Sequence, residues 1–303
     1  MAAGKKRSPV PERLPVPRTC KLYIKGAFVR PAAGRTLQCG SSRKERGGFV
    51  ARIAHASRKD FASAVTAARQ AFGPWAHRSA FNRSQILFRM AEMVDHRRAA
   101  LEAGLRTAAG LTAKGAAEEV SVAADRLFWY AGWADKYSQV LGGANPVAAP
   151  FLNITIPEPL GVVSVFASTR SPLVGLVSAV APVILSGNTA VVMVEGPAPT
   201  LAVDFAEVVA VSDVPAGVVN ILTGPREDIL PHAAAHMDVD GVAFFGGTVE
   251  EAKALEEASA GNLKRVHLFD DPEMGAWRED DMQSLYWIQP FLEWKTTWHP
   301  KGW

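Results

Sequence analysis

Between residues 160 and 268 the sequence repeats one pattern, in which a short run rich in valine and isoleucine precedes a longer stretch with helical spacing. The short runs are predicted as strands over 161–166, 189–194, 218–222, 241–245 and 265–268. The longer stretches are predicted as helices over 172–185, 200–212, 226–235 and 249–260. Parallel strands need crossover connections and are buried on both faces. The pattern therefore predicts an α/β fold with a Rossmann-like, doubly wound parallel sheet, whose ligands bind at the carboxyl ends of the strands.

The upstream sequence predicts a hairpin and three long helices. Residues 23–29 alternate about a central turn, which suits a hairpin at the edge of the fold. Ser57 begins a capping box, and we expect Pro74 to end the helix that follows. Two longer amphipathic helices are predicted over 82–105 and 113–140. The core side of the second is predicted to carry Val120, Leu127, Phe128 and Trp133.

Composition indicates a globular protein without a strongly charged face. The chain has 303 residues, 48% of them hydrophobic, and a net charge of +3 from 33 basic and 30 acidic residues. Much of the excess lies in residues 1–18, which we expect to form a flexible basic tail. Nucleic-acid binding through this tail is an alternative, but a solvated tail is favoured.

The cysteines and the apolar runs indicate in which cellular compartment the protein is expected. Cys20 and Cys39 are expected to pack as small apolar groups in a reducing environment. The longest apolar run, 173–185, is interrupted by Pro182 and falls short of the roughly 20 residues that a membrane span needs. The N-terminus shows no apolar core of a signal peptide. We therefore expect a cytoplasmic protein without a membrane partner.

Two groups of side chains have residue types that can bind metal, but another interpretation is favoured for each. His232 and His236 lie four residues apart on a predicted helix, a spacing compatible with zinc, but a solvated helix face is favoured. The acidic residues of 270–283 surround Pro272 and Gly275, which favours a flexible linker over a metal site. No metal site is predicted.

Several strand and turn motifs follow one another in a recognisable order. They are Glu-Pro-Leu-Gly-Val-Val at 158–163, Gly-Asn-Thr-Ala-Val-Val at 187–192, Pro-Ala-Gly-Val-Val-Asn-Ile-Leu-Thr-Gly at 215–224, Asp-Val-Asp-Gly-Val-Ala-Phe at 238–244 and Gly-Asn-Leu-Lys-Arg-Val at 261–266. In order and spacing they resemble the aldehyde dehydrogenase superfamily, and the resemblance covers about 20–269. It implies the nucleotide-binding domain of that family.

The tail extends the resemblance. Residues 293–300, Glu-Trp-Lys-Thr-Thr-Trp-His-Pro, are similar to the family's C-terminal oligomerisation strand, which pairs with a hairpin corresponding to about 147–158. A full-length member carries its catalytic domain between the positions of Phe269 and this strand, so that domain is expected to be absent. The truncation and the ending both resemble the second, non-catalytic half of family-sixteen aldehyde dehydrogenases.

The resemblance implies a domain organisation and an interface. The nucleotide-binding-type domain would comprise 19–142 and 159–269, the acidic linker 270–283, and the oligomerisation hairpin and strand 143–158 and 284–303. Five of the eight tryptophans lie in the last 27 residues, which favours an interface because tryptophan is enriched at interface anchors. The predicted interface residues are Ile154, Ile156, Trp294, Thr296 and Trp298.

The resemblance also identifies the positions of the family's catalytic groups. Aldehyde oxidation in this family uses a cysteine thiolate, an oxyanion hole with an asparagine, a glutamate base and NAD. Arg170 stands at the asparagine position and Phe269 at that of the glutamate, while the nucleophile's motif belongs to the absent domain. An aromatic ring cannot accept a proton from water. We therefore predict no catalytic residue, and we interpret Arg170 as a surface or interface cation.

The cofactor positions are changed as well. Met193 and Gly196 replace the lysine and glutamate that hold the adenosine ribose in the family. The pyrophosphate turn keeps its early residues, Gly246, Gly247 and Thr248, and opens a helix whose amides favour an anion. Glu250 and Glu251 then place carboxylates in the first turn, where they repel a diphosphate. No cofactor is expected, with weak NAD binding as the alternative.

Three functions follow from these observations. The favoured hypothesis is a pseudoenzyme subunit that lacks catalysis and joins itself or a full-length aldehyde dehydrogenase in a structural or regulatory role. The alternatives are the NAD(P)-binding part of an oxidoreductase, converting aldehyde to carboxylic acid and completed by another chain, and a simple nucleotide-binding module. The retained oligomerisation strand beside the lost active site favours the first.

Overall fold

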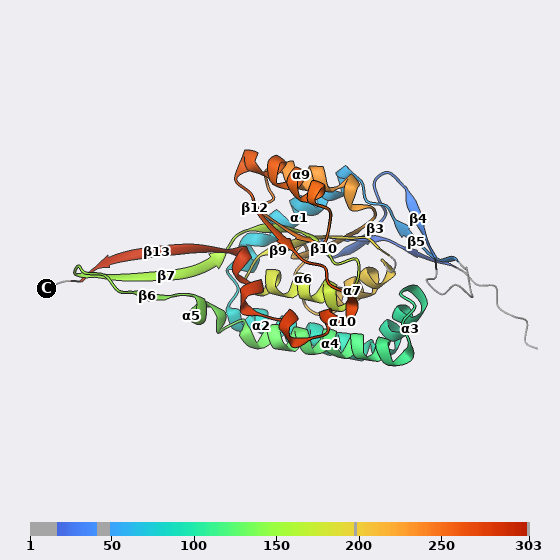
Figure 1. Cartoon of the computed structure of the whole chain (residues 1–303), viewed down its shortest axis with the longest axis horizontal. Coiled ribbons are helices and arrows are strands. Elements are labelled where there is room, and N and C mark those ends of the chain that lie inside the picture. The colour runs from blue at the N-terminus through green and yellow to red at the C-terminus, as the bar shows by residue number, and fades with distance from the viewer. Residues whose placement is uncertain (1–16, 41–48, 197–198, 302–303) are drawn as a thin grey trace, which may run out of the picture.

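The computed structural model describes residues 17–40, 49–196 and 199–301 around a central seven-stranded sheet (Figure 1). The strand order is β12-β11-β8-β9-β10-β2-β3, and the first five strands are parallel. These five are β8 (Val162–Phe166), β9 (Thr189–Val194), β10 (Val219–Thr223), β11 (Gly241–Phe245) and β12 (Arg265–Phe269). The predicted parallel sheet is confirmed, and each strand begins and ends within one residue of its predicted bounds.

The predicted edge hairpin completes this sheet. It consists of β2 (Leu22–Ile24), which pairs antiparallel with β10, and β3 (Ala27–Val29) at the edge. The turn residues Lys25 and Gly26 have φ angles of 53° and 75°. Two positive φ values match a tight hairpin turn whose twist suits the flanking strands.

Helices cover both faces of the sheet. Alternate residues of β8 point in opposite directions, so Val163 and Val165 join one apolar cluster while Val162 and Phe166 join another. The first cluster is closed by α6 (Val174–Leu185) and α7 (Thr200–Ala210), and the second by α1 (Arg58–Ala76), α8 (Leu230–Ala235) and α9 (Val249–Ser259). An outer layer contains α2 (Ala80–His96) and α4 (Ala113–Trp133), which pack on α6, and α3 (Arg98–Ala108), which packs on α4 and α7; the short α5 (Tyr137–Leu141) contacts the strand over 151–159. Short 3-10 turns lie at η2 (Arg226–Asp228) and η3 (Ala260–Asn262).

Several predicted helix bounds are wrong. Helix α1 continues through Pro74 to Ala76, because the buried Trp75 donates Nε1–H to the carbonyl of Ile184 at 3.0 Å and fixes the last turn. The predicted helices over 82–105 and 113–140 each divide into two, α2 with α3 and α4 with α5. Phe128, expected in the core, is 39% exposed. Tertiary contacts decide such bounds, and local periodicity does not record them.

A small sheet lies beside the main one. Its order is β1-β5-β4, formed by β1 (Arg18–Cys20), β4 (Thr36–Gly40) and β5 (Phe49–Ala54). It buries both cysteines, which pack with apolar neighbours as predicted and form no disulfide. Arg18, assigned to the flexible tail, instead belongs to β1 and forms ion pairs with Asp204 and Glu207. The preceding residues 1–16 lie outside the described part of the chain.

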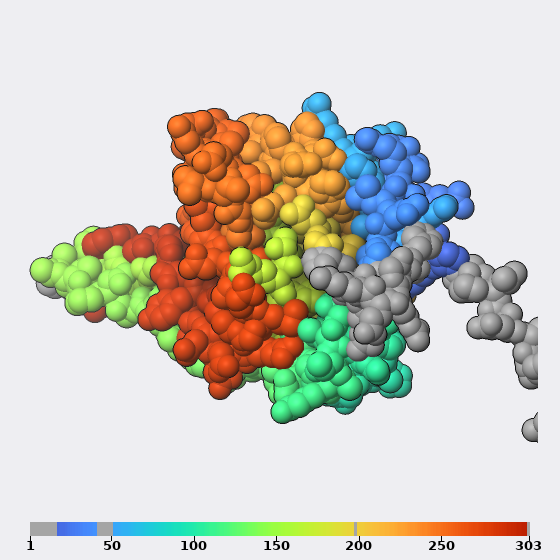
Figure 2. All heavy atoms as spheres, turned by 45° about the vertical axis from the view of Figure 1, so that its right-hand side comes forward, coloured from blue at the N-terminus to red at the C-terminus, as the bar shows by residue number. Residues whose placement is uncertain are grey.

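A three-stranded arm projects from the body (Figures 1 and 2). Its order is β13-β7-β6, from β6 (Gly143–Asn145), β7 (Phe151–Pro159) and β13 (Leu292–Pro300). Strands β7 and β13 are antiparallel, with Leu292 opposite Pro159 and Pro300 opposite Phe151. The predicted pairing of the C-terminal strand with this hairpin is confirmed.

The segment between β12 and β13 is not a flexible linker. It contains α10 (Met274–Trp277), η4 (Asp280–Met282), η5 (Leu285–Trp287) and η6 (Gln289–Phe291). Trp277 is fully buried, and Arg278 Nε donates to the buried carboxylate of Glu119 on α4 at 2.9 Å. These contacts overcome the flexibility that an acidic composition with proline and glycine indicates. Among the described residues, no helix is long and apolar enough to cross a membrane.

Candidate functional site

The candidate site lies where the chain reverses its direction of travel across the sheet. From β8 the chain first adds β9 and β10 on one side, and then returns to add β11 and β12 on the other. In open parallel sheets, ligands bind at the carboxyl strand ends beside such a switch point. Here the loops after β8, β11 and β12 enclose a groove of about 550 Å³.

The groove brings together most of the predicted site residues. Its lining includes Arg170, Gly246, Gly247, Thr248 and Phe269. The predicted ribose pair lies elsewhere: Met193 is a buried β9 residue of the core, 2% exposed, and Gly196 lines a second cavity. The switch point thus brings together the predicted catalytic and pyrophosphate positions and leaves out the predicted ribose pair.

Phe269 is held in an aromatic stack. Its ring lies parallel to Phe245 at a centroid distance of 4.6 Å and to Trp287 at 5.3 Å. Trp277 packs edge-on against Trp287 at 5.9 Å. The position of the family's base therefore anchors the C-terminal segment to the sheet, and its ring has no proton to transfer.

Arg170 lies on a loop that an aspartate fixes. Asp271 Oδ2 accepts the backbone N–H of Thr169 at 3.0 Å, and Asp271 Oδ1 accepts Nε1–H of Trp277 at 3.0 Å. The guanidinium of Arg170 extends outward to an ion pair with the exposed Glu273. This agrees with the interpretation of Arg170 as a surface cation.

The predicted pyrophosphate turn does open a helix. Thr248 caps α9, since its hydroxyl accepts the N–H of Glu251 at 3.2 Å while Glu251 Oε2 accepts the N–H of Thr248 at 2.8 Å. Gly246 and Gly247 have φ angles of 64° and 133°, which other residues rarely adopt. The glycines are thus required by the turn itself, and Glu251 serves as a capping residue.

Two charged residues of the site escaped the sequence analysis. Glu195 follows β9 and Arg226 follows β10, and Arg226 Nε lies 3.2 Å from Glu195 Oε1. Arg226 Nη2 also lies 3.2 Å from Glu251 Oε2. Their position was the signal available in the sequence. Glu195 comes directly after a buried apolar strand, and Arg226 follows the Gly-Pro that comes after the next one.

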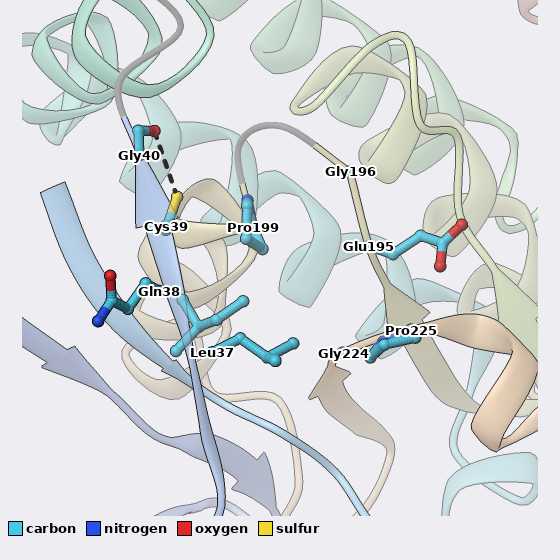
Figure 3. A pocket seen from close by; sticks show the side chains of 10 residues that line it. Leu37, Gln38, Cys39, Gly40, Glu195, Gly196, Pro199, Gly224 and Pro225 are labelled. Atoms are coloured by element: carbon cyan, nitrogen blue, oxygen red, sulfur yellow. Dashed lines mark hydrogen bonds between the residues drawn. The ribbon is translucent and has the colours of Figure 1, made fainter. Parts of the chain in front are cut away.

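A second, mostly apolar cavity of about 470 Å³ lies at the ends of β9 and β10 (Figure 3). Figure 3 shows one wall formed by the β4 residues Leu37, Gln38, Cys39 and Gly40, and the facing wall by Glu195, Gly196, Gly224 and Pro225. The carboxylate of Glu195 points away from the β4 wall. Glu195 thus lines this cavity and reaches the groove at the switch point through its ion pair with Arg226, which lines that groove.

The predicted interface residues lie on both faces of the arm. Directly opposed residues share a face, so Trp294, Thr296 and Trp298 lie on one face and Ile154 and Ile156 on the other. Trp298 is 57% exposed, Ile156 51% and Trp294 38%. Thr296 Oγ1 lies 2.9 Å from Thr155 Oγ1 across the strands.

The histidine pair is not placed as predicted. Helix α8 ends at Ala235, so His236 is an extended C-cap residue and the helical spacing to His232 does not apply. The ring of His236 packs edge-on against Phe61, and burial lowers its pKa. No group of three potential metal ligands occurs within residues 17–40, 49–196 and 199–301.

Known proteins share the fold and about a third of the aligned residues. The family model described as "Aldehyde dehydrogenase family" matches residues 35–275. Aldehyde dehydrogenase, cytosolic 1, of Elephantulus edwardii is 32% identical over 274 residues, covering 87% of this chain and 53% of that protein. An aldehyde dehydrogenase of Aspergillus niger is 32% identical over 248 residues, covering 82% of this chain and 49% of that protein.

The solved structures agree. PnpE from Pseudomonas sp. WBC-3 has a TM-score of 0.77 and 31% identity, over 82% of this chain and 50% of that one. The chain spans about half the length of the curated relatives that it matches. The resemblance inferred from the motifs is confirmed, and the chain belongs to the aldehyde dehydrogenase family.

Proposed function

We propose that the chain is a non-catalytic aldehyde dehydrogenase-like subunit that assembles through its arm, either with a second copy or with a full-length aldehyde dehydrogenase. The observation that carries the proposal is the exposed apolar surface on both faces of β7 and β13. Ile156 and Trp298 are each more than half exposed on an edge of the molecule. Such surface favours burial against another chain.

The chemistry of the groove supports a non-catalytic role. Phe269 and Arg170, which the resemblance assigns to the base and oxyanion positions, lie in an aromatic stack and in an ion pair. The two cysteines of the chain lie buried in the small sheet, and burial raises the pKa of the Cys20 thiol to about 11. A thiol with so high a pKa is protonated near neutral pH and is a poor nucleophile.

Cofactor binding is a separate part of the proposal. PnpE, a relative of this chain, has been solved in complex with nicotinamide adenine dinucleotide. In this chain Met193 and Gly196 offer no side-chain hydrogen bond to a ribose, and Glu251 sits at the helix end where a diphosphate would bind. We propose that the subunit works without NAD.

The test combines assembly with activity. The purified chain is mixed with an active aldehyde dehydrogenase from the same host, and native mass spectrometry measures the masses of the assemblies. We expect a homo-oligomer or a mixed oligomer, and no aldehyde oxidation by the chain alone with NAD. A monomer that joins neither itself nor the active enzyme, or turnover by the chain alone, contradicts the proposal.

A further inference from the structure

Three charged side chains that follow β9, β10 and β11 meet beside the groove, and the central one, Arg226, lines it. Glu195 Oε2 accepts the backbone N–H of Arg226 at 2.7 Å, and Glu195 Oε1 lies 3.2 Å from Arg226 Nε. On its other side, Arg226 Nη2 donates to Glu251 Oε2 at 3.2 Å. Because β8 lies between β9 and β11 in the sheet, these contacts span the switch point.

The three side chains are well shielded. The exposed fractions are 18% for Arg226, 26% for Glu195 and 27% for Glu251. The guanidinium of Arg226 also lies 5.1 Å from the centroid of the Phe244 ring. A shielded guanidinium held by two carboxylates and an aromatic face is a fixed part of the groove, unlike a mobile surface pair.

Glu251 takes the space that the glycine turn opens. A Cβ added to Gly247 would lie 3.1 Å from Glu251 Oε2 and 2.3 Å from Cε1 of Phe244. In a dinucleotide-binding turn, such a glycine lets the backbone approach the diphosphate. Here the same space contains the chain's own carboxylate and an aromatic ring.

A dinucleotide does not fit these residues. Its diphosphate needs free amides at the start of α9, and two of them are taken, because the N–H of Thr248 binds Glu251 Oε2 at 2.8 Å and the N–H of Glu251 binds Thr248 Oγ1 at 3.2 Å. The diphosphate would also approach the fixed charge of Glu251. On the ribose side, the 2% exposed Met193 has no hydrogen-bonding group to offer.

We infer that Glu195, Arg226 and Glu251 form an internal bridge that closes the groove to nucleotides, with the Glu251 carboxylate in the place of a ligand diphosphate. Arg226 supplies the cation that a phosphate would otherwise meet, and Glu195 orients it. Removal of the Glu251 carboxylate leaves the Arg226 guanidinium and the Thr248 N–H directed at one vacated anion position. The groove then accepts pyrophosphate.

Calorimetry with inorganic pyrophosphate and with NAD tests this bridge in the full chain. The wild type should show no saturable binding of either up to about 1 mM, and Glu251→Ala should bind pyrophosphate at least about tenfold more tightly. The double variant Glu251→Ala/Arg226→Ala should lose this gain. Glu250→Ala removes the same charge from the exposed neighbouring position, where solvent screens its repulsion, and should give a clearly smaller gain than Glu251→Ala.

Several results would overturn the inference. They are micromolar NAD binding by the wild type, an equal gain in Glu250→Ala, or retention of the gain in the double variant. If Glu251→Ala does not fold, Glu251→Ser, which also removes the carboxylate and empties its place, replaces it, and the absence of any gain in that variant also overturns the inference. The arm plays no part in these measurements, so an assembling protein that binds NAD would contradict the bridge and leave assembly intact.

Discussion

At the scale of single residues, the buried carboxylate of Glu119 joins three helices. It is fully buried and accepts the Ser171 hydroxyl at 2.8 Å, the N–H of Val174 at 3.1 Å and Nε–H of Arg278 at 2.9 Å. A buried carboxylate is tolerated only with donors and a cation. Glu119 thereby fixes the start of α6 and the C-terminal segment to α4.

We expect Arg278→Met to lower the free energy of unfolding by about 3 kcal/mol, because it leaves the buried Glu119 charge without its cation. The control is Arg89→Met, which removes an arginine paired with Glu92 on the exposed side of α2. Such surface pairs contribute about 0.5 kcal/mol. Urea unfolding of both variants measures the difference, and equal losses would contradict the role of Glu119.

Lys264 gives a pH-dependent prediction. The residue is 8% exposed, its ammonium donates to the carbonyl of His236 at 2.7 Å, and burial lowers the Lys264 pKa to about 8, against an opposing effect of Asp240. Between pH 8 and the ordinary lysine pKa of about 10.4, the folded state thus binds fewer protons than the unfolded state. Below pH 8 Lys264 is charged in both states, and burial of this charge lowers the free energy of unfolding. The loss disappears as the pH rises towards about 10.4.

The variant Lys264→Met should therefore be more stable than the wild type at pH 7, on the order of 2 kcal/mol, with the difference shrinking towards pH 10. The carbonyl of His236 keeps a second donor in Asn262 Nδ2, at 3.2 Å. Denaturant unfolding of both proteins at several pH values measures the difference. A constant difference across this range would exclude titration of Lys264 as its cause.

Sequence reasoning located those residues of the site whose signal is local. The glycines and Thr248 of the turn were found because a tight turn before a helix constrains nearby residue types. Glu119 and Arg226 were missed because their partners lie far along the chain, 159 residues away for Arg278 and 31 for Glu195. A charge on a helix or after a strand does not reveal such a partner before the fold is known.

At the scale of elements, the segment from α10 to η6 shows how composition misleads. Its acidic residues, proline and glycine indicate a flexible connection, yet its tryptophans pack against the body. Trp277 lies 5.8 Å from Phe245, and Arg126 donates to the carbonyls of Glu279 and Met282 at 3.0 Å. The strands were predicted more closely, because burial on both faces leaves an apolar run with sharp ends.

Two tryptophans of the tail, one buried and one exposed, should differ in how much they contribute to stability. Trp277→Ala should lower the free energy of unfolding by about 3–5 kcal/mol, since the side chain is fully buried. Trp298→Ala is the matched control: this side chain is 57% exposed on the arm, and its loss should change stability by less than about 1 kcal/mol. Thermal or urea unfolding measures both. A small loss for Trp277→Ala would restore the flexible-linker interpretation.

At the scale of the whole molecule, the fold divides into a body with its own core and an arm that lacks one. All but the first two residues of β13 are exposed, while the strands of the central sheet from β8 to β11 are buried throughout. An antiparallel ribbon of this length is marginal in water without a covering layer. The arm is therefore the part of the molecule that we propose another chain covers.

The contribution of each face of the arm to association can be tested by a separate substitution. Ile156→Thr changes one face and Trp298→Thr the other, and because both residues are more than half exposed, each variant should fold and weaken assembly by at least about tenfold. Phe81→Thr is the control, since Phe81 is 66% exposed on α2 of the body. Sedimentation equilibrium measures all three. Weakening by only one arm variant would mean that a single face is covered, and weakening by Phe81→Thr would move the interface to the helical layer.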